Sequence, residues 1–283
     1  MKRLFNALTR SKKPLQKMWL YLCLMCLTAV FLLPFVWTLS TALKTQQELN
    51  TWPLVWIPEQ LQWQNFVSAW QAQPFGQFLK NSLIVAVLTT IGQLFSSSLV
   101  AYGFARFEFR GKNALFMILL AGMMIPWDVT MIPLYMEFNY LGWINTLKPL
   151  IIPSFFGAPF FIFLLRQFIM NIPKELDDAA RMDGANAWQI YWHIHLPLML
   201  PALILVATFQ FLNSWNDYLG PLIFLNDQST YTLPLGLAQF KGLHESNLTA
   251  IAAMTILLCI PPLILFFFAQ KHIMHGTTEG GVK

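Results

Sequence analysis

Four polar side chains near the end of an apolar run could hydrogen-bond a solute. Gln210, Asn213 and Asp217 are three and four residues apart, so a helix would bring them onto one face. Asn216 lies beside them, and the neutral members of the set suit the hydroxyl groups of a sugar. The alternative is that these groups only hydrogen-bond neighbouring helices.

Residues suited to catalysis or metal binding are few. The sequence contains no G-x-x-x-x-G-K-[ST], H-E-x-x-H or G-x-S-x-G pattern. His193 and His195 would lie on different faces of a helix, which makes a poor metal pair. Cys23, Cys26 and Cys259 all lie in apolar runs, so lipid-buried small side chains explain them better than redox or metal use. We expect no catalysis, no metal and no cofactor bound by this chain.

One acid, Asp128, lies inside an apolar run, between Pro126 and Pro133. A charge within a membrane span usually faces protein or a water-filled path, and the alternative is a place near the outer interface. An ion-coupled secondary transporter would be expected to show more such groups and an internal repeat. Asp128 is the only candidate and no repeat is visible, so that class of protein is a weaker alternative.

The elements that must position these residues are apolar helices. The chain has 283 residues, of which 56% are hydrophobic and 11% charged, about half the charged fraction of soluble domains. Runs long enough to cross a bilayer of about 30 Å predict an all-α, polytopic membrane protein, residues 1–283 forming a single transmembrane domain. The six predicted transmembrane helices cover about residues 18–43, 81–105, 114–136, 150–170, 198–219 and 248–269.

The basic residues predict the orientation. With both termini inside, the inner segments carry 14 of the 18 Lys and Arg. This distribution by loop argues against nucleic-acid binding, and the first apolar run is too long for a signal-peptide core. We therefore expect cytoplasmic tails at 1–17 and 271–283, a periplasmic loop at 44–79 and a cytoplasmic segment at 172–197. Four tryptophans in the 44–79 loop favour an interfacial aromatic belt over a sugar-stacking platform: Trp52, Trp56, Trp63 and Trp70.

The 172–197 segment predicts two short helices joined by a tight turn. Pro173 suits a first helical position, and Gly184 suits the left-handed end of a helix. Asn186 and Gln189 have the spacing of a capping box that opens the second helix. The first turn of the first helix collects acids, which the helix dipole favours: Glu175, Asp177 and Asp178.

The same segment resembles the EAA loop in the membrane subunits of bacterial binding-protein-dependent ABC importers. That pattern is Glu-Ala-Ala, three residues, Gly, nine residues, then Ile-x-Leu-Pro. Here Asp178-Ala179-Ala180 leads at the same spacing to Gly184 and to Ile194-His195-Leu196-Pro197. Asp178 replaces Glu, which keeps the charge on a shorter arm. We call residues 172–197 the EAA-like segment.

The resemblance covers most of the chain and is closest to the sugar-importing, maltose-transporter branch, in particular its smaller permease subunit. Further similar stretches follow one another in order: Pro58 to Leu61 with Asn65-Phe66, Asn81 to Leu83, Ala101 to Phe107, Met124 to Pro126, Pro133 to Tyr135, Ser214 to Tyr218, Pro221-Leu222, and the tail Gly276 to Lys283.

The resemblance implies contacts with a separate ATPase. A compact, capped helix-turn can transmit a push, and small residues permit close approach. The alternative, an amphipathic helix on the lipid surface, is disfavoured by the acidic first turn. The implied ATPase-coupling residues are Asp178, Ala179, Ala180, Asp183, Gly184 and Ala185, and the implied ATPase-contacting residues of the tail are Glu279, Gly280 and Gly281.

The function implied is that of a permease subunit of an ATP-driven importer of a sugar or oligosaccharide in the bacterial cytoplasmic membrane. The implied partners are a homologous second permease, an ATPase dimer that uses ATP-Mg, a periplasmic or lipoprotein binding protein, and membrane lipid. Glycerol phosphate and glycerophosphodiesters are alternative substrates, but the scarcity of basic residues in the spans favours a neutral sugar. The candidate pathway residues are Asp128, Gln210, Asn213, Asn216 and Asp217.

Overall fold

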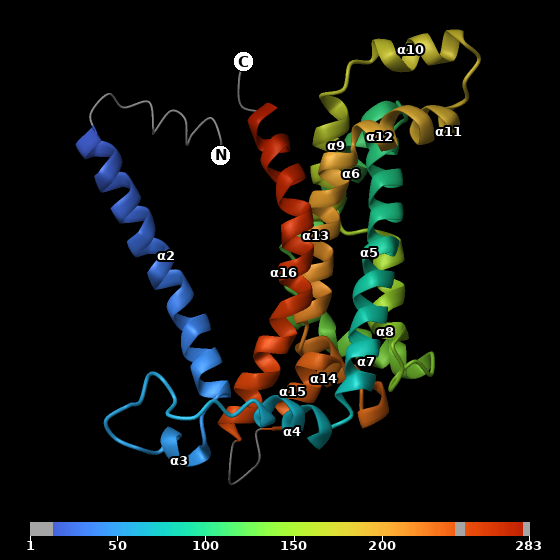
Figure 1. The fold of residues 1–283 in the computed structure, drawn as a ribbon. Coiled ribbons are helices and arrows are strands. Elements are labelled where there is room, and N and C mark those ends of the chain that lie inside the picture. Colours follow the sequence, from blue (N-terminus) through green and yellow to red (C-terminus); the bar gives the residue numbers. More distant parts are fainter. Residues whose placement is uncertain (1–13, 241–246, 280–283) are drawn as a thin grey trace. The chain divides into compact units, whose positions relative to one another are not determined.

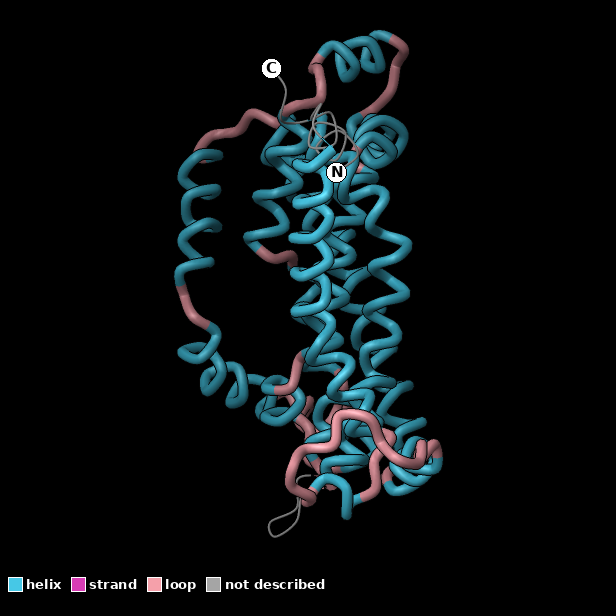
Figure 2. Tube along the Cα trace, turned by 60° about the vertical axis from the view of Figure 1, so that its left-hand side comes forward, coloured by secondary structure: helices cyan, strands magenta, loops and turns pink. Residues whose placement is uncertain are grey.

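The structure is a computed structural model that describes residues 14–240 and 247–279. Every regular element in these two ranges is helical, as the tube trace shows (Figure 2). The chain divides into two compact units, residues 1–74 with 237–261 and residues 75–236 with 262–283. The predicted all-α class is confirmed.

The first unit contains the N-terminal span. Helix α2 (Pro14–Ala42) is followed by α3 (Gln46–Leu49) and α4 (Gln64–Ala72). The side chain of Gln46 donates to Asn247 Oδ1 at 2.9 Å, just before α16 (Leu248–Glu279). Trp52 is 86% exposed, as a residue of an interfacial belt could be.

The second unit is organised around α5 (Phe75–Arg106), which packs against α9 (Pro159–Met170) and α13 (Leu200–Asn216), as in Figure 1. Small residues and aromatic rings from these helices form the core, with Leu165 and Ile169 fully buried. Helix α5 begins at Phe75, within the segment 44–79 that is predicted as a periplasmic loop.

The third predicted span is sharply broken. Helix α6 (Lys112–Ala121) and the 3-10 turn η1 (Gly122–Met124) meet α7 (Trp127–Tyr140) at 97°. Pro126 lies at the break, since it cannot donate to the preceding helix and restricts the residue before it. Pro133 lies inside α7, where the helix continues.

The fourth span is also interrupted. Helix α8 (Lys148–Ile151) and the 3-10 helix η2 (Ile152–Phe156) lead to α9 through Gly157, whose φ is +81°. A Cβ at Gly157 would lie 3.1 Å from Ile162 Cδ1, so glycine serves both the conformation and the close packing.

The EAA-like segment forms the predicted pair of helices, α10 (Glu175–Met182) and α11 (Ala187–Ile190). The helix α10 begins at Glu175, so the prediction that Pro173 holds the first helical position is wrong by two residues. A π-helical turn η3 (Tyr191–His195) and α12 (Leu196–Leu198) continue from α11, and the chain bends by 76° into α13.

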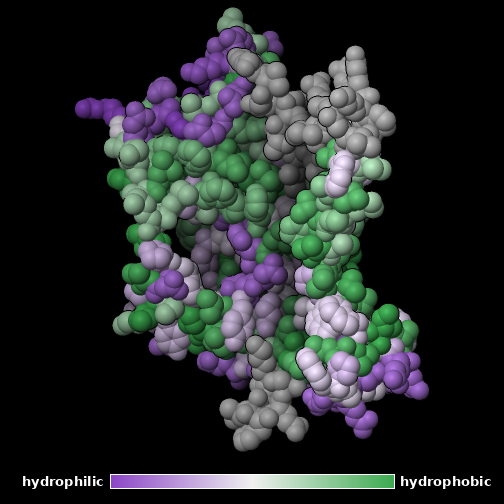
Figure 3. All heavy atoms as spheres, turned by 90° about the vertical axis from the view of Figure 1, so that its left-hand side faces the viewer, coloured by the Kyte–Doolittle hydropathy of each residue, from purple (hydrophilic) through white to green (hydrophobic). Residues whose placement is uncertain are grey.

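Three short helices after α13 were not predicted: α14 (Leu219–Phe224), η4 (Gln228–Thr230) and α15 (Leu233–Ala238). Within the described residues, four helices are long and apolar enough to cross a membrane, or up to six when each bent pair counts as one span. Figure 3 shows broad hydrophobic areas on the face that it views, together with hydrophilic residues at the extremities and between these areas. This distribution suits a multi-pass membrane protein.

Candidate functional site

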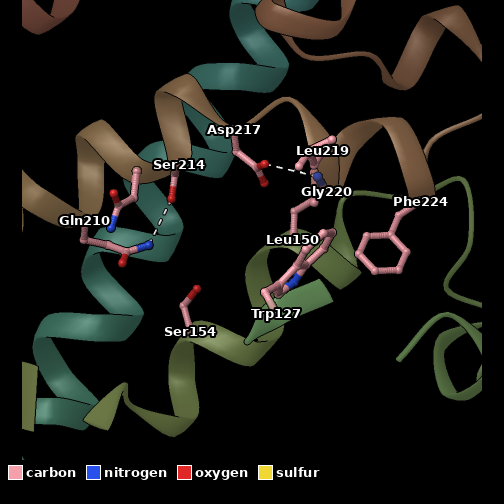
Figure 4. Close-up of a pocket in the computed structure, with 10 residues that line it drawn as sticks. Trp127, Leu150, Ser154, Gln210, Ser214, Asp217, Leu219, Gly220 and Phe224 are labelled. Atoms are coloured by element: carbon pink, nitrogen blue, oxygen red, sulfur yellow. Dashed lines mark hydrogen bonds between the residues drawn. The ribbon is translucent and has the colours of Figure 1, made fainter. Parts of the chain in front are cut away.

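The second unit contains a cavity of about 660 Å³ beside the last turns of α13. Figure 4 shows polar side chains from different elements facing the same space, among them Gln210 from α13 and Ser154 from η2. The lining residues are Trp127, Leu150, Ser154, Gln210, Asn213, Ser214, Asp217, Leu219, Gly220 and Phe224. The cavity therefore combines an apolar wall with hydrogen-bonding groups, as small-molecule sites do.

Part of the polar face of α13 is used for helix packing. Gln210 Nε2 donates to Ser214 Oγ at 2.9 Å, one turn further along the helix. Ser214 Oγ in turn lies 2.7 Å from Thr89 Oγ1 of α5. Ser214 thus lines the cavity and also contacts a neighbouring helix, while the binding of a solute by Gln210, Asn213 and Asp217 stays a prediction.

Asp217 closes one side of the cavity. Its Oδ1 accepts a hydrogen bond from the backbone N–H of Gly220 at 3.1 Å, at the start of α14. A Cβ at position 220 would lie 2.5 Å from Asp217 Oδ2, so the approach requires glycine. Among the ten described lining residues, Asp217 is the one acid and none is Lys or Arg. The lining disfavours an anionic solute on charge alone.

The structure brings three of the five candidate pathway residues to the cavity, namely Gln210, Asn213 and Asp217. Asn216 donates its side-chain N–H to Leu212 O of its own helix at 2.9 Å and is not among the lining residues. Asp128 is exposed in the first turn of α7, next to the lining residue Trp127. The place of all five residues in a transport pathway stays a prediction.

Several lining residues were missed from the sequence. Trp127, Leu150 and Ser154 line the cavity from the interrupted third and fourth spans. The prolines that interrupt those spans predict that the third and fourth helices line a path, as broken helices often do in membrane proteins, but they do not single out these three residues.

The turn of the EAA-like segment has well-defined local geometry. Gly184 has φ +83°, its N–H donates to Arg181 O at 3.0 Å, and the N–H of Ala185 donates to Ala180 O at 2.9 Å. These two bonds are those of a Schellman motif, which satisfies the last carbonyls of α10. The predicted capping box is present, with Asn186 and Gln189 each bonding the other's backbone N–H.

The candidate coupling residues lie on an accessible surface of the segment. Asp178, Ala179, Asp183 and Gly184 are exposed, whereas Ala180 and Ala185 are half-buried. An open groove of about 310 Å³ runs beside the turn. Its lining residues are Asp183, Gly184, Ala185, Gln189, Ile190, His193 and Ile194. Small side chains and a positive-φ glycine leave space there for a close approach by another surface.

The tail is described only in part. Glu279 is the last residue of α16. Gly280 and Gly281 lie outside the described residues.

The chain matches a family of transport proteins and several of its individual members. The family profile for the "Binding-protein-dependent transport system inner membrane component" matches residues 93–278. Similar proteins include a probable ABC transporter permease, YurM of Bacillus subtilis, 33% identical over 94% of this chain and 87% of that protein. The arabinooligosaccharides transport system permease AraQ of Halalkalibacterium halodurans is 36% identical over 84% of this chain and 86% of its own.

A solved structure supports the fold independently. A chain of a bacterial ABC transporter involved in the import of the acidic polysaccharide alginate aligns with a TM-score of 0.80. The alignment covers 91% of this chain and 96% of that chain, at 22% sequence identity. At this identity the likeness shows the fold alone.

Proposed function

The chain belongs to the family of inner membrane components of binding-protein-dependent transport systems, and from this premise we propose that it is a permease subunit of an ATP-driven sugar importer. Its role is to form part of the path by which a neutral sugar or oligosaccharide crosses the bacterial cytoplasmic membrane. The observation that carries the proposal is the cavity beside α13, with amide, hydroxyl and carboxylate groups opposite an indole and no basic lining residue among those described.

The substrate class follows from the chemistry of that lining. Gln210, Asn213 and Ser154 offer neutral donors and acceptors, and Asp217 adds an acceptor, a combination suited to sugar hydroxyls. Trp127 supplies an apolar aromatic surface for a sugar ring. The name of the arabinooligosaccharide relative supports the same class. Glycerol phosphate and glycerophosphodiesters are less suited, because their negative charge would meet Asp217 without a basic counterpart in the described lining.

The EAA-like segment is the proposed contact with the ATPase. The Schellman turn at Gly184 projects a compact surface, and Asp178 and Asp183 are exposed beside it. Asp178 Oδ1 lies 3.4 Å from Arg181 Nη1 at the surface, and both carboxylates would make charge-assisted hydrogen bonds with a partner. The small residues Ala179, Ala180 and Ala185 permit close packing. Binding and hydrolysis of ATP-Mg would take place on the partner, and this chain would be non-catalytic.

The assembly proposed comprises this chain, a homologous second permease, an ATPase dimer and a binding protein, either periplasmic or lipid-anchored. Both termini and the EAA-like segment would lie in the cytoplasm, as the distribution of Lys and Arg predicts. The tail at Glu279, Gly280 and Gly281 would reach the ATPase.

The substrate class is tested by uptake in cells. A strain lacking this chain but retaining its partner subunits is compared with the complemented strain, using labelled neutral oligosaccharides and labelled glycerol 3-phosphate. The proposal expects loss and restoration of oligosaccharide uptake only. Loss of glycerol 3-phosphate uptake with unchanged oligosaccharide uptake would replace the neutral-sugar assignment.

A further inference from the structure

Three ionisable side chains are buried together where α10 meets α5 and η3. Arg106 is the last residue of α5, Asp177 lies in the first turn of α10, and His195 ends η3. Their side chains are at most 4% exposed. Burying a charged group is costly unless it is paired, so a cluster of this kind indicates a specific arrangement.

Each carboxylate oxygen of Asp177 contacts a side chain from a different element. Its Oδ2 lies 3.2 Å from Arg106 Nε, and its Oδ1 lies 2.8 Å from His195 Nε2. Since a carboxylate can only accept, His195 carries its proton on Nε2, and a neutral imidazole leaves the cluster with no net charge. Arg106 Nη2 also donates to Ile172 O at 2.6 Å, just before α10. The three side chains therefore connect both ends of the EAA-like segment to α5.

Aromatic residues extend the same connection. The ring of Tyr102, one turn before Arg106, lies 4.9 Å from the ring of His195, and its hydroxyl donates to Ala187 O at 3.1 Å. The hydroxyls of Tyr191 and Ser98 lie 2.8 Å apart in the buried interior. Every one of these contacts joins α5 to the EAA-like segment.

We propose that Asp177 is a positioning residue, which locks α10 to α5 so that a displacement of α10 moves the transmembrane helices instead of bending the segment. The inference rests on the proposed function, because it concerns how movement at the ATPase contact reaches the membrane. It assigns different tasks to adjacent acids. Asp178 is exposed and is assigned here to the contact with the ATPase, whereas Asp177 is buried and contacts its own chain. Arg106 and His195 act through Asp177.

The lock is tested first by the geometry of the chain in the assembled complex. Cys23, Cys26 and Cys259 are replaced by serine, and spin labels are placed at Asn113→Cys on α6 and Met182→Cys on α10. We expect one narrow distance distribution, and a broadened distribution when Asp177→Asn is added. The matched control is Glu175→Gln, which removes an exposed charge from the same turn of α10 and should leave the distribution narrow. An equally narrow distribution with Asp177→Asn would overturn the proposal.

The second measurement is the number of substrate molecules transported per ATP hydrolysed in proteoliposomes containing the complete complex. Asp177→Asn should reduce this ratio about two- to thirtyfold, the range found for residues that modulate coupling between sites, while the ATPase still co-purifies. Glu175→Gln should leave the ratio unchanged. An unchanged ratio with Asp177→Asn would contradict the role of the lock.

Asp177→Asn leaves Arg106 as a buried uncompensated charge, which could prevent assembly. The double variant Arg106→Leu with Asp177→Leu removes both charges, and buried ion pairs often tolerate apolar replacement. We expect assembly to be restored and the transport ratio to stay low. Restoration of both would show that the pair only balances charge, and the positioning role would fall. If the wild-type complex moves no sugar, the proposed substrate fails, but the distance measurement still decides whether the lock exists.

Discussion

The hydroxyl oxygens of Thr89 and Ser214 lie 2.7 Å apart and join α5 to α13 at the edge of the cavity. Gln210 donates to the same Ser214 oxygen, so the polar face of α13 is held in place by the helix that forms the centre of the second unit. A site held by such contacts is preorganised, which lowers the entropic cost of binding a flexible ligand. The cavity and the packing of the bundle therefore depend on the same residues.

Replacing Asn213 tests whether the cavity lies on the transport path. Asn213→Leu removes two donors and an acceptor from the lining and keeps a similar volume. A lost hydrogen bond to a neutral partner costs about 0.5–1.5 kcal/mol. We therefore expect the sugar concentration that half-saturates ATPase stimulation to rise, or the uptake rate to fall, by about two- to tenfold. Co-purification of the partners should not change. Asn139→Leu, on the exposed side of α7, is the matched control, and equal transport by both variants would return Asn213 to a packing role.

Substitutions at Gly184 test the backbone conformation of the turn separately from the chemistry of a side chain. Its φ of +83° disfavours a Cβ, and no atom lies within 4 Å of the position that a Cβ would take. Gly184→Ala should therefore weaken ATPase binding through the backbone, by about 1–2 kcal/mol or roughly five- to thirtyfold. Gly184→Asn should weaken it less, because asparagine adopts this conformation more readily.

Gly111 provides the control for the backbone strain that any substitution of a positive-φ glycine introduces. It has φ +82° and equally open surroundings, but lies between α5 and α6. Gly111→Ala should lower the thermal stability of the chain and leave ATPase affinity, measured by titration in detergent, close to that of the wild type. Equal losses of affinity for Gly111→Ala and Gly184→Ala would contradict a specific role for the EAA-like segment.

The capping box of α3 predicts a pH dependence outside the membrane spans. Hydrogen bonds from the backbone N–H groups of Thr45, at 2.7 Å, and Glu59, at 3.0 Å, lower the pKa of Glu48 below its ordinary value. Because the pKa is lower in the folded state, the stabilisation is present above the unfolded value of about 4.3 and is lost as the pH falls through the folded pKa. The amide protection factors of Thr45 and Glu59 should drop in that acid range, measured by hydrogen exchange. Glu48→Gln should make them insensitive to pH there, and a persistent acid drop in this variant would assign the effect to another group.

Gly236 tests the packing of α15. A Cβ at this position would collide with the ring of Phe78, which is fully buried and has little room to move. Gly236→Ala should cost about 1–3 kcal/mol, as overpacking of a filled interior does, seen as a lower unfolding temperature in detergent. Gly103→Ala is the control, since no atom lies within 4 Å of its added Cβ, and it should unfold at or above the wild-type temperature. A wild-type unfolding temperature for Gly236→Ala would show that the packing there is looser than described.

The features that could be predicted from the sequence are local in the chain. The Schellman turn at Gly184 and the capping box of Asn186 and Gln189 depend on residues within five positions of one another, so their residue types predict their geometry. The shared face of Gln210, Asn213 and Asp217 follows in the same way from helical periodicity.

The features that were missed depend on residues far apart in sequence. Asp177 looked equivalent to Glu175 and Asp178 as an acid in a first helical turn, but α5 brings Arg106 against it from 71 positions away. The sequence predicts a break at Pro126 in the third span, but the contribution of Trp127 to the cavity depends on the 97° angle of that break. Proline marks such a break in the sequence but does not give its angle.

We propose that this chain couples ATP hydrolysis on a partner to sugar movement through its own helices. The most direct measurement is uptake of a labelled neutral oligosaccharide into proteoliposomes that contain this chain, its second permease, the ATPase and the binding protein, with ATP-Mg on the ATPase side. We expect uptake that requires ATP-Mg and the binding protein and that falls with Gly184→Ala. Uptake by this chain alone, driven by a proton or sodium gradient without ATP, would contradict it.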